Sequence, residues 1–336
     1  LAVEAMGSDS RGLERSCGGI EDVLGKRDTQ TRFNPSILPG ATHKPVRKFL
    51  LPVKAMVLVV VLLTSVSVAM SADRFSVASG ACTSTSVWSA TSGGIPGATA
   101  PVAADNVFIE GGFTVTVDAT AACTNLSIAS ASTLTVGAFA ITVSGTTSVT
   151  GTLTISSSTG VKTFTGLVTI NPGGTWTSTA STFSTRLIFN NGITNNSSNV
   201  FNAGGATFNT NAQVTGGTGS FSFTQVTVTG VTVTNNGAFT AATALGGTGQ
   251  FSNAATGTLN LSGTAASCSI TTLANAGIIN RSNTGTTTTA LANFTNTGTI
   301  NITGSGAITG ITNNAAGIVN HSGSSTITSF NNATAT

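Results

Sequence analysis

The chain has little charge and lacks tyrosine altogether. Only 7% of its 336 residues are Asp, Glu, Lys or Arg, whereas about a quarter is usual in soluble domains. Residues 1–72 hold nine of the 13 basic residues and six of the 10 acidic ones. The few charges that follow cancel one another and form no basic patch, so we expect no nucleic-acid partner.

Carboxylates are missing from most of the chain. No Asp or Glu occurs from Ala119 to Thr336, and His321 is the only histidine after residue 72. This part of the chain therefore lacks the paired carboxylates of glycosidases and the oxygen ligands of calcium sites. A Ser-His-Asp arrangement would have to join His321 to a distant carboxylate, and no phosphate-binding Gly-Lys-Ser/Thr loop occurs. We predict that the protein is not an enzyme and has no catalytic residue, metal or cofactor.

Cysteines are few, and their spacing does not suit a metal site. After residue 72 there are three, Cys82, Cys123 and Cys268, and no two are close enough in sequence to act as a pair of metal ligands. Cys82 and Cys123 flank the first module of the chain, so they are candidates for a disulfide in an oxidising compartment. Two buried free thiols are the alternative. We expect Cys268 to be a small core residue.

Residues 46–72 have the pattern of a secretory signal peptide. Three basic residues precede the apolar run Ala55–Val68, and the small residues between Ala69 and Ala72 offer a cleavage site. The alternative is a transmembrane anchor, but the run is short for a span and ends in small residues. We therefore predict a secreted or cell-surface protein that meets the membrane only through this signal.

Residues 1–45 precede that signal and mix charges, Pro and Gly without apolar periodicity. We expect a poorly structured leader here. Because a signal peptide belongs at the start of a chain, the alternative is that translation begins near Val46 or at Met56 and that the leader is not translated.

A four-residue phrase recurs near the end of the chain, and its glycines are 20, 21 and 19 residues apart. The four copies are Gly257-Thr-Leu-Asn260, Gly277-Ile-Ile-Asn280, Gly298-Thr-Ile-Asn301 and Gly317-Ile-Val-Asn320. A second phrase, which ends in Asn275, Asn296, Asn313 and Asn332, keeps step with the first. A period of about 20 residues is typical of stacked solenoid repeats.

The residues of the repeat favour strands. Thr, Val and Ile fit a pleated surface, and Gly and Asn supply turns, whereas the usual residues of surface helices are scarce and no 3.6-residue periodicity occurs. A unit this short cannot bury its apolar face alone but can do so when it is stacked on its neighbours. We therefore predict an all-β fold, a parallel β-solenoid with about 20 residues per coil, preceded by a signal-peptide helix.

Stacking in this register predicts two rows of side chains. Leu259, Ile279, Ile300 and Val319 should form an inward apolar row, and Asn260, Asn280, Asn301 and Asn320 a row beside it whose amides bond along the axis. The next inward position also holds Arg281 and His321. We expect it to lie at a strand end, where a long side chain can turn out to solvent.

Residues 73–136 differ from the later repeats and contain six phrases in a fixed order. These are Trp88-Ser89, Gly93-Gly-Ile-Pro96, Asp105-Asn-Val-Phe-Ile109, Thr114-Val-Thr-Val-Asp118, Asn125-Leu-Ser-Ile128 and Thr133-Leu-Thr-Val136. The order resembles the N-terminal module of secreted bacterial β-helix proteins of the adhesin and autotransporter-passenger type. The sequence departs from that pattern in the inserted stretch 98–103. The resemblance implies surface or secreted placement and a module that caps the first coil.

The residues of this module agree with a capping role. Phe113, Val115 and Val117 should alternate inward, and Trp88 should cover the open end of the core. An aromatic platform for a sugar is the alternative role of Trp88. The carboxylates of the module have no accompanying basic or histidine partner in the sequence.

Residues 137–336 continue as β-solenoid repeats, and their many phenylalanines should fill the core. The sequence ends just after a repeat phrase, without a polar capping segment. An uncovered last coil exposes a strand edge. We therefore expect a chain truncated at its C-terminus, with end-to-end self-association as the alternative.

Three functions remain. The first, which we favour, is a structural or adhesive surface protein whose neutral face of Thr, Asn and Ser contacts carbohydrate or other cell-surface components. The second is an ice-binding solenoid with aligned Thr-x-Thr pairs. Six pairs are available: Thr114/Thr116, Thr133/Thr135, Thr152/Thr154, Thr175/Thr177, Thr227/Thr229 and Thr232/Thr234. The third is a fragment of a polysaccharide-active β-helix enzyme whose active site lies in a missing portion.

Overall fold

The computed structural model describes residues 71–178, 186–263, 267–282, 293–308 and 310–332, which all belong to one compact unit, Ser67–Thr336. The predicted leader, residues 1–45, and the predicted signal, residues 46–72, lie outside these ranges except for Ser71 and Ala72. Among the described residues there is no helix of the length and apolarity that a membrane span requires.

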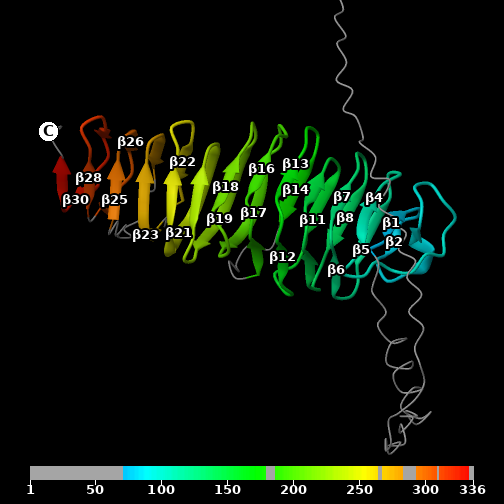
Figure 1. Ribbon diagram of the computed structural model, residues 1–336. Helices are drawn as coiled ribbons and strands as arrows, with labels where there is room; N and C mark the ends of the chain where they lie inside the picture. Colours follow the sequence, from blue (N-terminus) through cyan, green and yellow to red (C-terminus); the bar gives the residue numbers. More distant parts are fainter. Residues whose placement is uncertain (1–70, 179–185, 264–266, 283–292, 309, 333–336) are drawn as a thin grey trace, which may run out of the picture. The chain divides into compact units, whose positions relative to one another are not determined.

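The prediction of a parallel β-solenoid is confirmed. In the described ranges, the strands from β4 onward pair in parallel with strands about 20 residues further along the chain. At the N-terminal end, β1 and β2 pair in parallel with β4 and β5, which lie 33 and 35 residues further on, and β1 also pairs antiparallel with β3. One sheet of 29 strands wraps around the core, and β27 and β30 form a separate pair. Successive coils follow one another in chain order, from β1 and β2 at one end to β30 at the other (Figure 1). Each coil therefore supplies the backbone partners of the next.

A coil has three strand segments, which stack into three faces. Face 1 consists of β1 (Asp73–Ser76), β4 (Asn106–Ile109), β7 (Leu126–Ile128), β10 (Thr147–Val149), β13 (Val168–Ile170), β16 (Ile193–Asn195), β18 (Gln213–Gly216), β20 (Thr232–Asn235), the ends of β21 and β23, β25 (Asn293–Asn296), β28 (Ile311–Asn313) and β31 (Phe330–Asn332).

Face 2 follows face 1 in every coil. It consists of β2 (Gly80–Ala81), β5 (Thr114–Val117), β8 (Thr133–Val136), β11 (Thr152–Ile155), β14 (Thr175–Ser178), the starts of β17, β19 and β21, β22 (Thr258–Leu261), β24 (Ile278–Arg281), β26 (Thr299–Ile302) and β29 (Ile318–His321).

Face 3 completes the coil. It consists of β6 (Ala121–Cys123), β9 (Ile141–Val143), β12 (Lys162–Phe164), β15 (Leu187–Phe189), the ends of β17 (Phe201–Phe208) and β19 (Ser220–Val228), the middle of β21 (Ala238–Asn253) and the start of β23 (Ser267–Asn275). The short pair β27 (Ala307–Ile308) and β30 (Thr326–Ile327) follows face 2 in the last coils.

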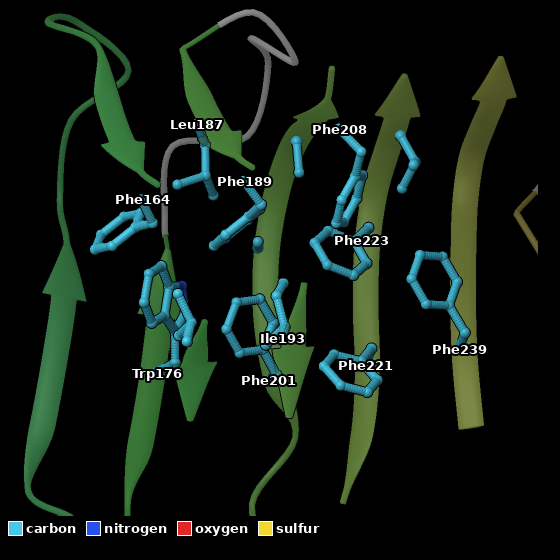
Figure 2. Close-up of a cluster of buried hydrophobic side chains, with 14 of the residues drawn as sticks. Phe164, Trp176, Leu187, Phe189, Ile193, Phe201, Phe208, Phe221, Phe223 and Phe239 are labelled. Atoms are coloured by element: carbon cyan, nitrogen blue, oxygen red, sulfur yellow. The ribbon is translucent and has the colours of Figure 1, made fainter. Parts of the chain in front are cut away.

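Strand alternation explains which residues fill the interior. In strands such as β8 and β11, buried Leu, Val and Ile alternate with partly exposed Thr. In the middle coils the core becomes aromatic, and rings contact one another from coil to coil (Figure 2). The ring centroids of Trp176 and Phe201 are 4.8 Å apart, and those of Phe223 and Phe239 are 4.9 Å apart. The described phenylalanines of these coils therefore form a continuous stacked core.

Trp88, in the N-terminal module, belongs to the buried core. A 3-10 turn, η1 (Thr85–Val87), leads into β3 (Trp88–Ser89), which pairs with β1. The Trp88 side chain is fully buried, and its indole N–H donates a 2.7 Å hydrogen bond to the carbonyl of Cys82. Val115 and Val117 are buried beside it, but Phe113 is only partly buried. Its ring packs against Gly111, so the predicted inward position of Phe113 is wrong.

Candidate functional site

The outer surface of face 2 carries a column of side chains in which each member pairs with its counterpart in the next coil. Every member has a hydroxyl or an amide group, and none is charged. This polar column consists of Thr116, Thr135, Thr154, Thr177, Asn202, Ser222, Thr240, Asn260, Asn280, Asn301 and Asn320. It runs through all the described coils of face 2 from β5 to β29.

A second outward column lies beside it, two residues earlier in each strand. In the first four coils its members are Thr114, Thr133, Thr152 and Thr175. Four of the six Thr-x-Thr pairs that the sequence suggests are thus aligned on one face. The other two are not, because Thr227 lies on face 3 and Thr232 and Thr234 lie on face 1. In the later coils this flanking column alternates between Thr258, Ile278, Thr299 and Ile318.

The later half of the polar column is an amide ladder. Asn280 Nδ2 donates to Asn260 Oδ1, Asn301 donates to Asn280, and Asn320 donates to Asn301, each at 2.9 Å. The inward row beside it holds Leu259, Ile279 and Ile300, which are buried, and Val319, which is partly buried. The structure therefore places the eight predicted ladder residues in two registered rows.

The chain matches no protein-family model, and no curated protein or solved structure is significantly similar to it.

A second amide ladder, which the sequence analysis did not identify, lies at the ends of the face 1 strands and is buried except for its last member, Asn332. Each amide Nδ2 donates to Oδ1 of the next coil, over 2.7–3.1 Å. The members are Asn235, Asn253, Asn275, Asn296, Asn313 and Asn332. The donors point toward later coils, whereas those of the exposed ladder point toward earlier ones. The signal for it was the second repeated phrase, in which four of these residues recur.

The buried ladder explains the glycine of the repeated phrase. Asn253 Nδ2 donates to the carbonyl of Gly257 at 3.2 Å, and Asn313 Nδ2 donates to that of Gly317 at 2.8 Å. A Cβ on Gly257 would lie 2.4 Å from Asn253 Oδ1, and one on Gly317 would lie 2.2 Å from Asn313 Oδ1. At these two positions only glycine can approach the ladder this closely, whereas a Cβ on Gly277 or Gly298 would first meet a backbone carbonyl at 2.2 Å.

The prediction for the inward position of Arg281 and His321, two residues after the apolar row, is wrong for Arg281. Arg281 was expected to turn out to solvent, but it is 3% exposed and stacks between Leu261 and Ile302. Its Nη2 donates to the carbonyl of Ser305 at 3.3 Å, and burial lowers the pKa of the guanidinium. His321, two coils after Arg281, is exposed, and its Nε2 lies 2.8 Å from Ser325 Oγ.

The cysteines of the N-terminal module are free thiols, which is the second of the two alternatives for this pair. Cys82 and Cys123 line the same small apolar cavity beneath Trp88, and the predicted disulfide is not formed. Burial, with a smaller effect of Asp118, raises the pKa of Cys82 to about 11. Burial, with a smaller effect of Cys82, raises that of Cys123 to about 12. Such thiols are poor nucleophiles at neutral pH.

The carboxylates of the module are structural or exposed. Asp105 is buried, accepts hydrogen bonds from the amides of Ala72 and Val102, and lies 3.5 Å from Nε of Arg74. The expectation that the module's carboxylates lack a basic partner is therefore wrong for Asp105. Asp118 is partly exposed, and its hydrogen bond from the Thr83 hydroxyl is the main cause of its lowered pKa. No group of three or more His, Cys, Asp and Glu suited to a metal occurs in the described ranges.

Proposed function

We propose that this protein is a non-enzymatic β-solenoid, exported through residues 46–72, whose face 2 contacts carbohydrate on a surface. The observation that supports this proposal is the polar column, which offers hydroxyl and amide groups at every coil without a charged member. Coils in a parallel sheet are about 4.8 Å apart. The column therefore presents a long row of neutral donors and acceptors at a fixed spacing.

The chemistry of the amide ladder suits a neutral polyhydroxylated ligand. Asn280 and Asn301 each use one N–H and one lone pair for their neighbours in the ladder, and a second N–H and lone pair are left for other partners. In the flanking column, Ile278 and Ile318 are 42% and 55% exposed. They offer apolar contacts to the C–H face of a sugar, next to amides that can bind its hydroxyl groups.

Binding to insoluble polysaccharides and to a glycan array tests the proposal. Thr154→Arg places a bulky charge in the polar column, and Thr169→Arg places the same charge on the outer side of face 1. Both threonines are partly exposed, so the two variants are matched. We expect Thr154→Arg to weaken binding at least about tenfold, or about 1.4 kcal/mol, and Thr169→Arg to have little effect. Equal effects, or no glycan bound by the unaltered chain, would contradict the proposal.

Ice binding is the second candidate, because four Thr-x-Thr pairs are aligned in consecutive coils of face 2. A flat, rigid grid of hydroxyl and methyl groups can hold ordered water. Thermal hysteresis that disappears in Thr154→Arg and persists in Thr169→Arg would favour this function over carbohydrate contact.

A further inference from the structure

The N-terminal module has a surface cavity, lined in part by Phe113, which directly precedes β5 of face 2. Its volume is about 240 Å³, whereas the cavity beneath Trp88 and the one beside Lys162 measure about 20 and 10 Å³. The smaller two hold little more than one water molecule. The larger one has room for a small organic group and is open to solvent.

Two apolar walls define this cavity. One is the ring of Phe113, which lies so close to Gly111 that a Cβ there would meet the ring at 2.5 Å. The other is the loop that contains Gly93 and Pro96. Gly93 and Gly111 have φ values of 62° and 70°, a region that favours glycine, so the backbone shapes both walls. The cavity is therefore built by the fold rather than left by loose packing.

Glu110 supplies the charge of the cavity, and it is held in place from both sides. Its backbone N–H donates to Ser76 Oγ at 2.8 Å, and the Ser76 hydroxyl donates to its carbonyl at 3.1 Å. Its carboxylate Oε1 accepts a hydrogen bond from the hydroxyl of Ser92, which precedes the loop of the opposite wall. Within the described ranges, this carboxylate has no other hydrogen bond and no basic group within 4 Å.

We propose that this cavity binds an organic cation, an alkylammonium group on a short apolar stem. A carboxylate without a counter-ion attracts a cation, and charge-assisted hydrogen bonds to an ammonium group are stronger than those to a neutral hydroxyl. The Phe113 ring offers a cation–π contact or an apolar wall for the stem, and Pro96 extends the apolar surface. The volume is smaller than the roughly 300–1,000 Å³ of pockets for drug-sized ligands, which limits the ligand to a few non-hydrogen atoms.

Titration of the full chain with n-butylammonium chloride, followed by ligand-observed NMR, tests this site. We expect saturable binding with a Kd on the order of 1–10 mM, in keeping with a ligand of about five non-hydrogen atoms. n-Butanol has the same stem without the charge and should bind at least about tenfold more weakly. Glu110→Gln keeps an acceptor for Ser92 but removes the charge, and it should weaken n-butylammonium binding about tenfold or more.

Asp118→Asn is the matched control, because Asp118 is another hydrogen-bonded carboxylate of the same module and lies outside the cavity. Asp118→Asn should bind n-butylammonium as tightly as the unaltered chain does. Phe113→Leu should bind n-butylammonium more weakly, although the cavity still has room for the butyl stem. Thermal melting of each variant checks that the module is folded. Binding unchanged in Glu110→Gln, equal binding of n-butanol, or no saturable binding by the unaltered chain would overturn the proposal.

Discussion

Single asparagines contribute very differently to this fold, although both ladders use the same chemistry. Asn275 is 2% exposed, donates to Asn296, Gly277 and Thr299, and accepts from Asn253. Asn280 makes two ladder bonds on the outer side of face 2, where water can replace them. The cost of removing an amide should therefore depend on the ladder to which it belongs.

We predict that Asn275→Ala destabilises the protein by about 2–4 kcal/mol, because it leaves buried polar groups without partners. Asn280→Ala should cost less than about 1 kcal/mol, since its neighbours remain accessible to water. Urea-induced unfolding of the two variants, followed by circular dichroism, measures the difference. Similar unfolding midpoints for both variants would show that the buried ladder contributes no more than the exposed one.

The sequence shows two sets of repeated asparagines, but only one of the two was predicted to form a ladder. The phrase that ends in Asn260 predicts a ladder, whereas the phrase that ends in Asn275 was used only as evidence that the repeat is regular. Both sets have the same period, so spacing cannot tell a buried amide from an exposed one. The burial of Arg281 was missed for a related reason: its surroundings depend on side chains in other coils.

Among the elements, strand β12 shows how a coil accommodates a charge at an inward position. Lys162 pairs with Ile141 and Leu187 in the neighbouring coils and is 2% exposed. Its ammonium group donates to the carbonyls of Ser157, Thr159 and Gly160 in the turn before the strand. The lysine therefore holds this turn against the core.

Burial, with a smaller contribution from Arg186, lowers the pKa of Lys162 below its ordinary value of 10.5. The folded protein thus releases this proton at a lower pH than the unfolded chain does. Between the lowered pKa and 10.5, the unfolded state binds more protons, so this residue's contribution to stability rises with pH. We predict that the unaltered chain gains stability relative to Lys162→Met as the pH is raised through this window.

Paired urea titrations of the two proteins at several alkaline pH values measure this difference. The methionine variant is the control, because the other titrating groups are common to both chains and cancel. A stability difference that stays constant or moves in the opposite direction with pH would contradict the prediction.

At this scale, the local alternation of residues could be predicted and the assignment of strands to faces could not. Thr114/Thr116 and the next three pairs recur at coil spacing, so their alignment on face 2 followed from the sequence. Thr227 has the same local pattern but lies on face 3. Irregular coil lengths between Gly137 and Gln250 hide which segment of a coil a strand occupies.

For the molecule as a whole, the aromatic core should make stability uneven along the coils. Phe201 has its ring centroid 4.8 Å from that of Trp176 and also contacts Phe189, Phe221 and Phe223. The last described strands are less protected, and every residue of β31 is exposed. In a stacked repeat, each coil gains stability from its nearest neighbours. The well-packed central coils should therefore open less often than the coils at an end, and their backbone amides should be better protected from exchange.

We predict that native-state hydrogen exchange is slowest in β17, β19 and β21 and fastest in β28 and β31. Mass spectrometry of peptides from the labelled protein measures this profile. Phe201→Ala should cost about 3–5 kcal/mol and raise exchange most in the adjoining coils. Uniform protection along the coils, with or without the substitution, would show that the aromatic centre is no more stable than the rest of the solenoid.

The solenoid itself could be predicted because a period of about 20 residues and the scarcity of helix-forming residues both indicate it. The three faces could not, because a sequence period gives the length of a coil and not the positions of its corners. The cavity beside Glu110 could not be predicted either, because its walls come from Gly93 and Phe113, which are distant in sequence and are brought together by the fold.

The buried amide ladder has a consequence for how such a chain can change over generations. Each regular coil makes the same asparagine hydrogen bonds to the next coil and has the same close glycine, so one such coil can take the place of another in the stack. Duplicating or deleting one whole unit of DNA would rejoin equivalent partners, whereas losing a few residues would break the match. Length variation among descendants of this gene should therefore come in steps of one coil.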